Sequence, residues 1–154
     1  MNMSAFDPSS FLDATIDTPT EKRPPIPVGD YTATIGEITV RPWQGKKDPT
    51  KSGIAYDVPL TVEIPADVQA SLGITASTLQ FKDSIMLDLT ENGTIDNSPG
   101  KNRRLRMYRE AADMNKPGDV FSARKLTGVV IKVKISHDIW EGQPIEKVDG
   151  VARF

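Results

Sequence analysis

Apolar side chains alternate with other residues from Ile54 to Ile64 without a change of phase. The apolar positions are Ile54, Tyr56, Val58, Leu60, Val62 and Ile64. A repeat of two residues places these side chains on one face of a β-strand, so the segment predicts a half-buried strand with Tyr56 in the core. Pro59 has the opposite parity and predicts that part of this strand lies at a sheet edge, because proline has no N–H to donate. Any fold of this chain has to include this strand.

Four other segments have strand-like patterns. The first alternates at Tyr31, Ala33 and Ile35, and then resumes on the opposite parity at Ile38 and Val40. A phase change beside Gly36 predicts a β-bulge that bends one long strand; the alternative is two short strands with a kink between them. The remaining segments run through Phe81, Ile85, Leu87 and Leu89, through Val129, Ile131, Val133 and Ile135, and over residues 145–151.

Residues 101–115 form the only convincing helix in the sequence. Leu105, Tyr108, Ala111 and Ala112 recur at three- and four-residue spacing, and Pro117-Gly118 marks the end. The resulting order is bent strand, strand, strand, helix, strand, strand. This is the order of the OB-fold, so we predict a mainly β protein: a five-stranded, OB-fold-like Greek-key barrel with one helix between strands 3 and 4. A mixed α+β sandwich is the alternative.

Two regions differ in composition. Residues 1–27 lack periodicity, are acidic and contain Pro19 and the run Pro24-Pro25-Ile26-Pro27, which predicts a flexible, proline-containing arm. Residues 28–154 are predicted to form the barrel domain. Within the arm, Asp7-Pro8-Ser9 can cap a short helical turn, and the apolar side chains Phe6, Phe11 and Leu12 make the arm an alternative dimerisation element. A homodimer is therefore one of the expected states.

The composition excludes several classes of protein. The chain of 154 residues has no cysteine, which excludes disulfides and thiolate metal sites, and this fits a reducing cytoplasm. No run approaches the roughly 18 apolar residues that would span a membrane. The first 17 residues lack a basic n-region and do not resemble a secretory signal. We therefore predict a cytoplasmic protein without a membrane partner.

The net charge of −2 conceals an uneven distribution. The first quarter of the chain is acidic, whereas residues 101–134 have a strong excess of lysine and arginine. Such asymmetry favours an anionic partner, although solvated faces are the plain alternative.

Both tryptophans, Trp43 and Trp140, fall in predicted loops, over residues 41–53 and 137–144. These loops correspond to the ones that flank the ligand-binding face of an OB-fold. Aromatic planes stack on bases, and basic side chains follow phosphates. The predicted nucleic-acid-binding residues are Arg41, Trp43, Lys46, Lys47, Lys51, Arg103, Arg104, Arg106, Lys132, Lys134 and Trp140. The alternatives are that Trp43 caps the barrel, that Trp140 packs on the last strand, and that the arginines form the solvated side of the helix.

No catalytic signature is present in the sequence. His137 is the single histidine, no glycine-rich phosphate loop occurs, and the carboxylates are scattered. We therefore predict a protein that is not an enzyme, with no metal and no cofactor.

Short motifs are distributed over residues 28–149. They are Val28-Gly29-Asp30-Tyr31, Lys51-Ser52-Gly53, Arg103-Arg104-Leu105, Leu126-Thr127-Gly128-Val129-Val130 and Trp140-Glu141-Gly142. Their spacing resembles a family of bacteriophage OB-fold single-stranded DNA-binding proteins. The resemblance implies a role in phage replication or recombination, in host cytoplasm, with replication or recombination proteins as partners. The chain differs from many such proteins because it ends Asp149-Gly150-Val151-Ala152-Arg153-Phe154 and has no acidic tail, which puts recruitment through the C-terminus in doubt.

The function expected from these features is non-enzymatic coating of single-stranded DNA with little sequence preference, with RNA as the alternative polymer. The rival hypothesis is a structural or protein-interaction module of a phage particle, built on the same small barrel.

Overall fold

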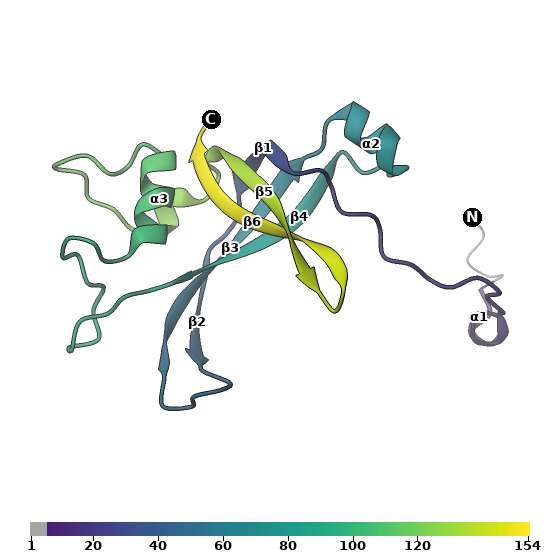
Figure 1. Cartoon of the computed structure of the whole chain (residues 1–154), viewed down its shortest axis with the longest axis horizontal. Helices are drawn as coiled ribbons and strands as arrows, with labels where there is room; N and C mark the ends of the chain where they lie inside the picture. The colour runs from purple at the N-terminus through teal and green to yellow at the C-terminus, as the bar shows by residue number, and fades with distance from the viewer. Residues whose placement is uncertain (1–5) are drawn as a thin grey trace.

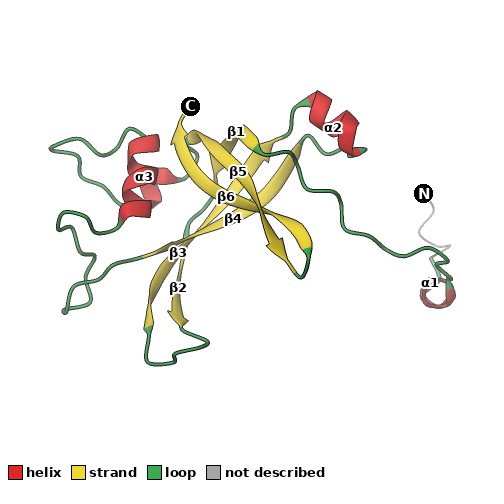
Figure 2. Cartoon of the chain, in the orientation of Figure 1, coloured by secondary structure: helices red, strands yellow, loops and turns green. Residues whose placement is uncertain are grey.

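The computed structural model describes residues 6–154, and the protein is mainly β (Figures 1 and 2). Six antiparallel strands form one sheet, and three short α-helices and a 3₁₀ turn over Ala123–Leu126 accompany it. The strands are β1 Gly29–Ile35, β2 Thr39–Gln44, β3 Ser52–Glu63, β4 Thr78–Met86, β5 Val130–Trp140 and β6 Gln143–Arg153. The helices are α1 Pro8–Asp13, α2 Ala66–Leu72 and α3 Arg103–Ala111. The prediction of a mainly β protein is confirmed.

The sheet is open. Its strand order is β2-β3-β1-β5-β6, and β4 pairs with β3 outside this path. Within the described part of the chain, β4 pairs only with β3, and β6 pairs only with β5. The side chain of Arg104 connects them, because its Nε donates to Asp83 Oδ2 on β4 at 2.9 Å and its Nη2 donates to the carbonyl of Val148 on β6 at 2.9 Å. The expected closed barrel of five strands is therefore not confirmed.

The sixth strand results from the predicted bend. Ile35 pairs with Leu60 and Thr39 pairs with Asp57, so three residues on the first strand face two on β3. The Gly36 amide donates to the Pro59 carbonyl at 2.8 Å within this irregular step. The extra residue splits one bent path into β1 and β2. The edge position predicted from Pro59 is wrong, because β3 is paired on both sides and Pro59 lies opposite the irregular step.

The core lies between the alternating positions of the strands and one face of α3. Val58, Leu60 and Val62 of β3 are fully buried, and Leu105, Tyr108 and Ala111 of α3 are also buried, as their spacing predicted. Tyr56 is only half-buried and packs against the core. Helix α3 is shorter than predicted, because Asn102 takes a left-handed conformation with a φ of 51° and hydrogen-bonds to Asp88 and Asp96 instead of extending the helix.

The N-terminal segment has two parts. Residues 6–22 are exposed, and α1 lies well away from the sheet (Figure 1). Residues 23–27 contact the β5–β6 hairpin: Arg23 pairs with Glu146 at 3.0 Å, and His137 Nε2 hydrogen-bonds to the Ile26 carbonyl at 2.6 Å. Ile26 is completely buried, so the part of the chain that packs with the sheet includes residues from the predicted arm. No helix among the described residues is long and apolar enough to cross a membrane.

Candidate nucleic-acid interface

The β2–β3 hairpin carries the first tryptophan. The predicted loop over residues 41–53 is wrong in extent: β2 continues to Gln44, β3 starts at Ser52, and only residues 45–51 form the turn. The turn is closed by the Gly45 amide, which donates to the Lys51 carbonyl at 2.8 Å. A Cβ at Gly45 would lie 2.5 Å from the Asp48 carbonyl oxygen, so this tight turn requires glycine. The hairpin extends away from the body of the sheet (Figure 1).

Trp43 lies on a strand, directly opposite Gly53. A Cβ built on Gly53 would lie 2.8 Å from Nε1 of Trp43 and 3.0 Å from its Cε2, so the indole rests on the glycine backbone. The indole Nε1 is buried and has no hydrogen-bond partner among the described residues. The side chain as a whole is only half-buried. The indole is therefore held against the sheet with part of its surface accessible.

Register places Trp43 and Arg41 on one face of the sheet, together with alternate residues of β3 and β4. Asp57 and Ser84 are paired across β3 and β4 on this face, and Arg41 joins them. Its Nε donates to Asp57 Oδ2 at 2.9 Å, while Ser84 Oγ donates to Asp57 Oδ1 at 2.9 Å. The hydrogen bond from Arg41 holds the pKa of the Asp57 carboxyl below its usual value, and the bond from Ser84 adds to this effect. Arg41 thus neutralises an acidic group on the face and is itself 40% exposed.

The turn of the hairpin is basic. Lys46, Lys47 and Lys51 are exposed, and none of them forms an ion pair within residues 6–154. On β4, Lys82 is exposed opposite Pro59 and adds a cation that the sequence analysis missed. Its position between the half-buried Phe81 and Asp83 is the signal that could have placed it on the solvent face. These lysines give the edge and the middle of the face a positive charge.

A groove of about 540 Å³ lies between the unpaired edges of β4 and β6. Lys82 and Ser84 line it on the β4 side, and Ile145 and Lys147 line it on the β6 side. Asp83 and Arg104 also line it, and Asp83 Oδ2 accepts a second hydrogen bond from the Tyr108 hydroxyl at 2.7 Å. Burial is the main cause that raises the pKa of Tyr108, so this hydroxyl stays protonated and donates to the carboxylate. The groove is therefore open to solvent and has a hydrogen-bonded network within it.

The β5–β6 hairpin carries the second tryptophan. The predicted loop over residues 137–144 is wrong, because β5 runs to Trp140 and β6 begins at Gln143. The turn consists of Glu141 and Gly142, both with positive φ, which is the geometry of tight two-residue hairpins. Trp140 is 62% exposed beside this turn. Lys132 and Lys134 are exposed at positions of β5 that share its parity, so the strand presents one aromatic and two basic side chains on the same side.

The predicted arginines of α3 do not lie with the tryptophans. Helix α3 lies at the end of the sheet away from both hairpin turns (Figure 1). Arg104 is occupied by Asp83 and Val148, as described above. Arg106 lies 3.7 Å from Glu110 in a loose ion pair, and Arg103 is exposed. The structure therefore separates Arg103 and Arg106 from the face that contains Trp43, whereas Arg104 lines the groove between β4 and β6.

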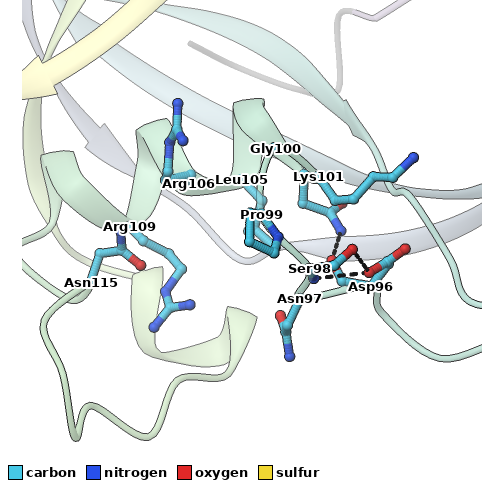
Figure 3. Close-up of a pocket in the computed structure, with 11 residues that line it drawn as sticks. Asp96, Asn97, Ser98, Pro99, Gly100, Lys101, Leu105, Arg106, Arg109 and Asn115 are labelled. Carbon is cyan, nitrogen blue, oxygen red and sulfur yellow. Dashed lines mark hydrogen bonds between the residues drawn. The ribbon is translucent and has the colours of Figure 1, made fainter.

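A smaller cavity of about 180 Å³ lies between residues 96–101 and α3 (Figure 3). Hydrogen bonds from the hydroxyl and amide of Ser98 hold the pKa of the Asp96 carboxyl below its usual value. The long side chains of Lys101, Arg106 and Arg109 point in different directions in Figure 3 and do not converge on one point. Residues 6–154 contain no group of three or more histidine, aspartate or glutamate side chains placed to hold a metal ion.

Comparison of the chain with protein-family models and with curated proteins gives no match.

Proposed function

We propose that the protein binds single-stranded DNA without sequence preference and has no catalytic activity. The observation that carries this proposal is the half-buried indole of Trp43 on a face with Lys82 on β4 and, at its edge, three lysines that form no ion pair within residues 6–154. Base stacking contributes about 1–3 kcal/mol per base and accepts any sequence, while lysines follow the phosphates. A single strand of RNA offers the same contacts.

We also propose that the sheet is an OB-fold that has not closed. The bent β1–β2 path, the pairing of β1 with both β3 and β5, and the position of α3 before β5 follow the order of that fold. The OB-fold binds its ligands on the face of its second and third strands. Those strands correspond to β3 and β4 here, where Ser84 and Lys82 lie and where Arg41 of β2 binds Asp57 and Ser84.

On this proposal, the bound DNA strand begins at the basic turn of the β2–β3 hairpin and crosses Trp43. It continues past Lys82 into the groove between β4 and β6, where Lys147 provides the next cation. It ends at Trp140, or along Lys132 and Lys134 on the same side of β5. Resemblance to the phage family supports a role in DNA replication or recombination in host cytoplasm, alongside proteins of those processes.

A titration with oligo-dT tests the proposal. Binding should quench tryptophan emission, and Trp43→Ala should lower the affinity by about 1–3 kcal/mol. Trp43→Phe retains an aromatic plane and should recover most of that loss, which separates stacking from folding. Unchanged emission at saturating oligo-dT, together with equal affinities for all three proteins, would refute the proposal.

A protein-interaction module of a phage particle is the second candidate. The exposed apolar side chains Ile139 and Trp140 at the β5–β6 turn favour it, since exposed apolar patches are typical of protein interfaces. This candidate would be favoured if Trp140→Ala kept the wild-type affinity for oligo-dT but no longer bound a protein partner.

A further inference from the structure

The exposed part of the N-terminal arm carries an apolar cluster. Phe6, Phe11, Leu12 and Ile16 are each more than half exposed, and Leu12 is 84% exposed. The rings of Phe6 and Phe11 lie side by side, with centroids 5.6 Å apart. No residue of α1 is buried. Large apolar side chains gathered on one short segment are typical of a surface that binds another protein.

The same segment is acidic. Asp7, Asp13, Asp17 and Glu21 lie within it, and none of them forms an ion pair among the described residues. Asp7 accepts a hydrogen bond from the Ser9 amide and so caps the helix that presents Phe11 and Leu12. A partner surface for this segment therefore needs an apolar base and positive charges around it.

Helix α3 provides such a surface. An open groove of about 500 Å³ on α3 is lined by Arg103, Arg104, Arg106, Met107 and Glu110. Met107 is half-buried and gives the groove an apolar base. Arg103 has no ion pair within the described part of the chain, and Arg106 has only the loose contact with Glu110. The groove thus combines apolar surface with two arginines, Arg103 and Arg106, that have no close ion pair among the described residues.

The positions of α1 and α3 bear on which copy's arm can occupy the α3 groove. Helix α1 and helix α3 lie at opposite ends of the longest axis of the molecule (Figure 1). The root of the arm is fixed on β6 by the Arg23–Glu146 ion pair and by the buried Ile26. In this arrangement α1 does not contact the groove of its own chain, which leaves the groove open to the arm of a second copy.

We propose that the arm of one copy docks through Phe11, Leu12 and its carboxylates into the α3 groove of the next copy. The contact joins two different surfaces, so it repeats from copy to copy and builds an open chain. It needs no nucleic acid and does not depend on the function proposed above.

A labelled peptide of residues 6–22 and a protein that lacks residues 1–22 test the docking directly. The peptide should bind this shortened protein, and Arg103→Glu with Arg106→Glu should weaken binding roughly tenfold or more, because each arm carboxylate then meets a like charge. The control Lys101→Glu with Arg124→Glu makes the same change in net charge outside the groove and should bind normally. Equal binding to the groove variant and the control, or no binding at all, would overturn the proposal.

Sedimentation of the full chain without DNA tests the arrangement between copies. The average mass should rise with protein concentration, and deletion of residues 1–22 or Phe11→Asp with Leu12→Asp should keep the protein monomeric. Arg103→Glu with Arg106→Glu should also prevent association. Adding Asp13→Lys and Asp17→Lys to this variant should restore association, because the charges on the two surfaces are then opposite again. A full chain that stays monomeric at all concentrations, or that associates equally well without its arm, would show that the arm does not join copies.

Discussion

The indole of Trp43 lies on the backbone of Gly53, in the space that a side chain at position 53 would occupy. The two residues face each other across the β2–β3 hairpin. The candidate site therefore depends on the absence of a side chain at position 53 as much as on the presence of an aromatic ring at position 43.

Gly53→Ala should displace the indole. The added methyl group would lie 2.8 Å from Nε1, so the ring must move, and overpacking of this kind costs about 1–3 kcal/mol. In a Trp140→Phe background the emission of Trp43 should shift to longer wavelength, and affinity for oligo-dT should fall. Gly150→Ala is the control, because its Cβ would meet only Met107 Sδ at an ordinary 3.5 Å. An unchanged spectrum for Gly53→Ala would contradict the observed packing.

The lysines of the β2–β3 turn should determine part of the salt dependence of binding. Each phosphate contact on a single strand contributes about −0.7 to the slope of log K against log salt. Replacing Lys46, Lys47 and Lys51 with glutamine should therefore flatten the slope by about two units. The control variant Lys101→Gln, Lys116→Gln and Lys125→Gln removes the same charge outside the β2–β3 turn and should change the slope little. Equal slopes for the two triple variants would show that the lysines of the turn contribute only through the net charge of the protein and do not contact phosphates.

The arm and the folded domain should separate between residues 22 and 26. Deleting residues 1–22 removes only exposed side chains and should leave the melting temperature nearly unchanged. Deleting residues 1–27 also removes the fully buried Ile26, and Ile26→Ala alone should cost about 2–5 kcal/mol. Chemical denaturation of the three proteins checks this. Equal stability of the two deletions would contradict the packing of Ile26.

Acid should weaken the Arg41–Asp57 pair. The pKa of Asp57 is lower in the folded protein than its ordinary value of 3.8, so the stabilisation from the pair is complete above that value and is lost as pH falls through the folded pKa. Asp57→Asn lacks this titration. Its melting temperature should differ from that of the native chain at neutral pH, and the difference should shrink below about pH 4. A difference that stays constant down to pH 2 would refute the assignment.

Periodicity predicted the main strands well because burial of one face enforces a repeat of two. Residues 54–62 of the first predicted strand lie in β3, residues 131–135 of the later one lie in β5, and the stripe of Leu105 and Tyr108 lies in α3. The hairpin ends were predicted as loops, since Trp43 and Trp140 have polar and glycine neighbours. Cross-strand hydrogen bonds, which leave no periodic pattern, extend the strands through both residues.

The candidate site was harder to predict than the strands. Contacts between residues far apart in the sequence decide which cations are left to bind a phosphate, and the sequence does not reveal these contacts. Arg41 forms an ion pair with Asp57, and Arg104 forms one with Asp83. Lys82 was missed because its parity, opposite to that of Phe81 and Ile85, was not used to place it on the solvent face. Whether these residues contact nucleic acid remains a prediction.

The unpaired edges of β4 and β6 are connected by the side chain of Arg104 rather than by a ladder of backbone hydrogen bonds. A side chain can change rotamer without disturbing either strand, whereas a ladder fixes the spacing of two strands at about 4.8 Å. The distance between these edges can therefore vary while both hairpins keep their own hydrogen bonds. We therefore expect this spacing to change more readily than the spacing of the strands within either hairpin.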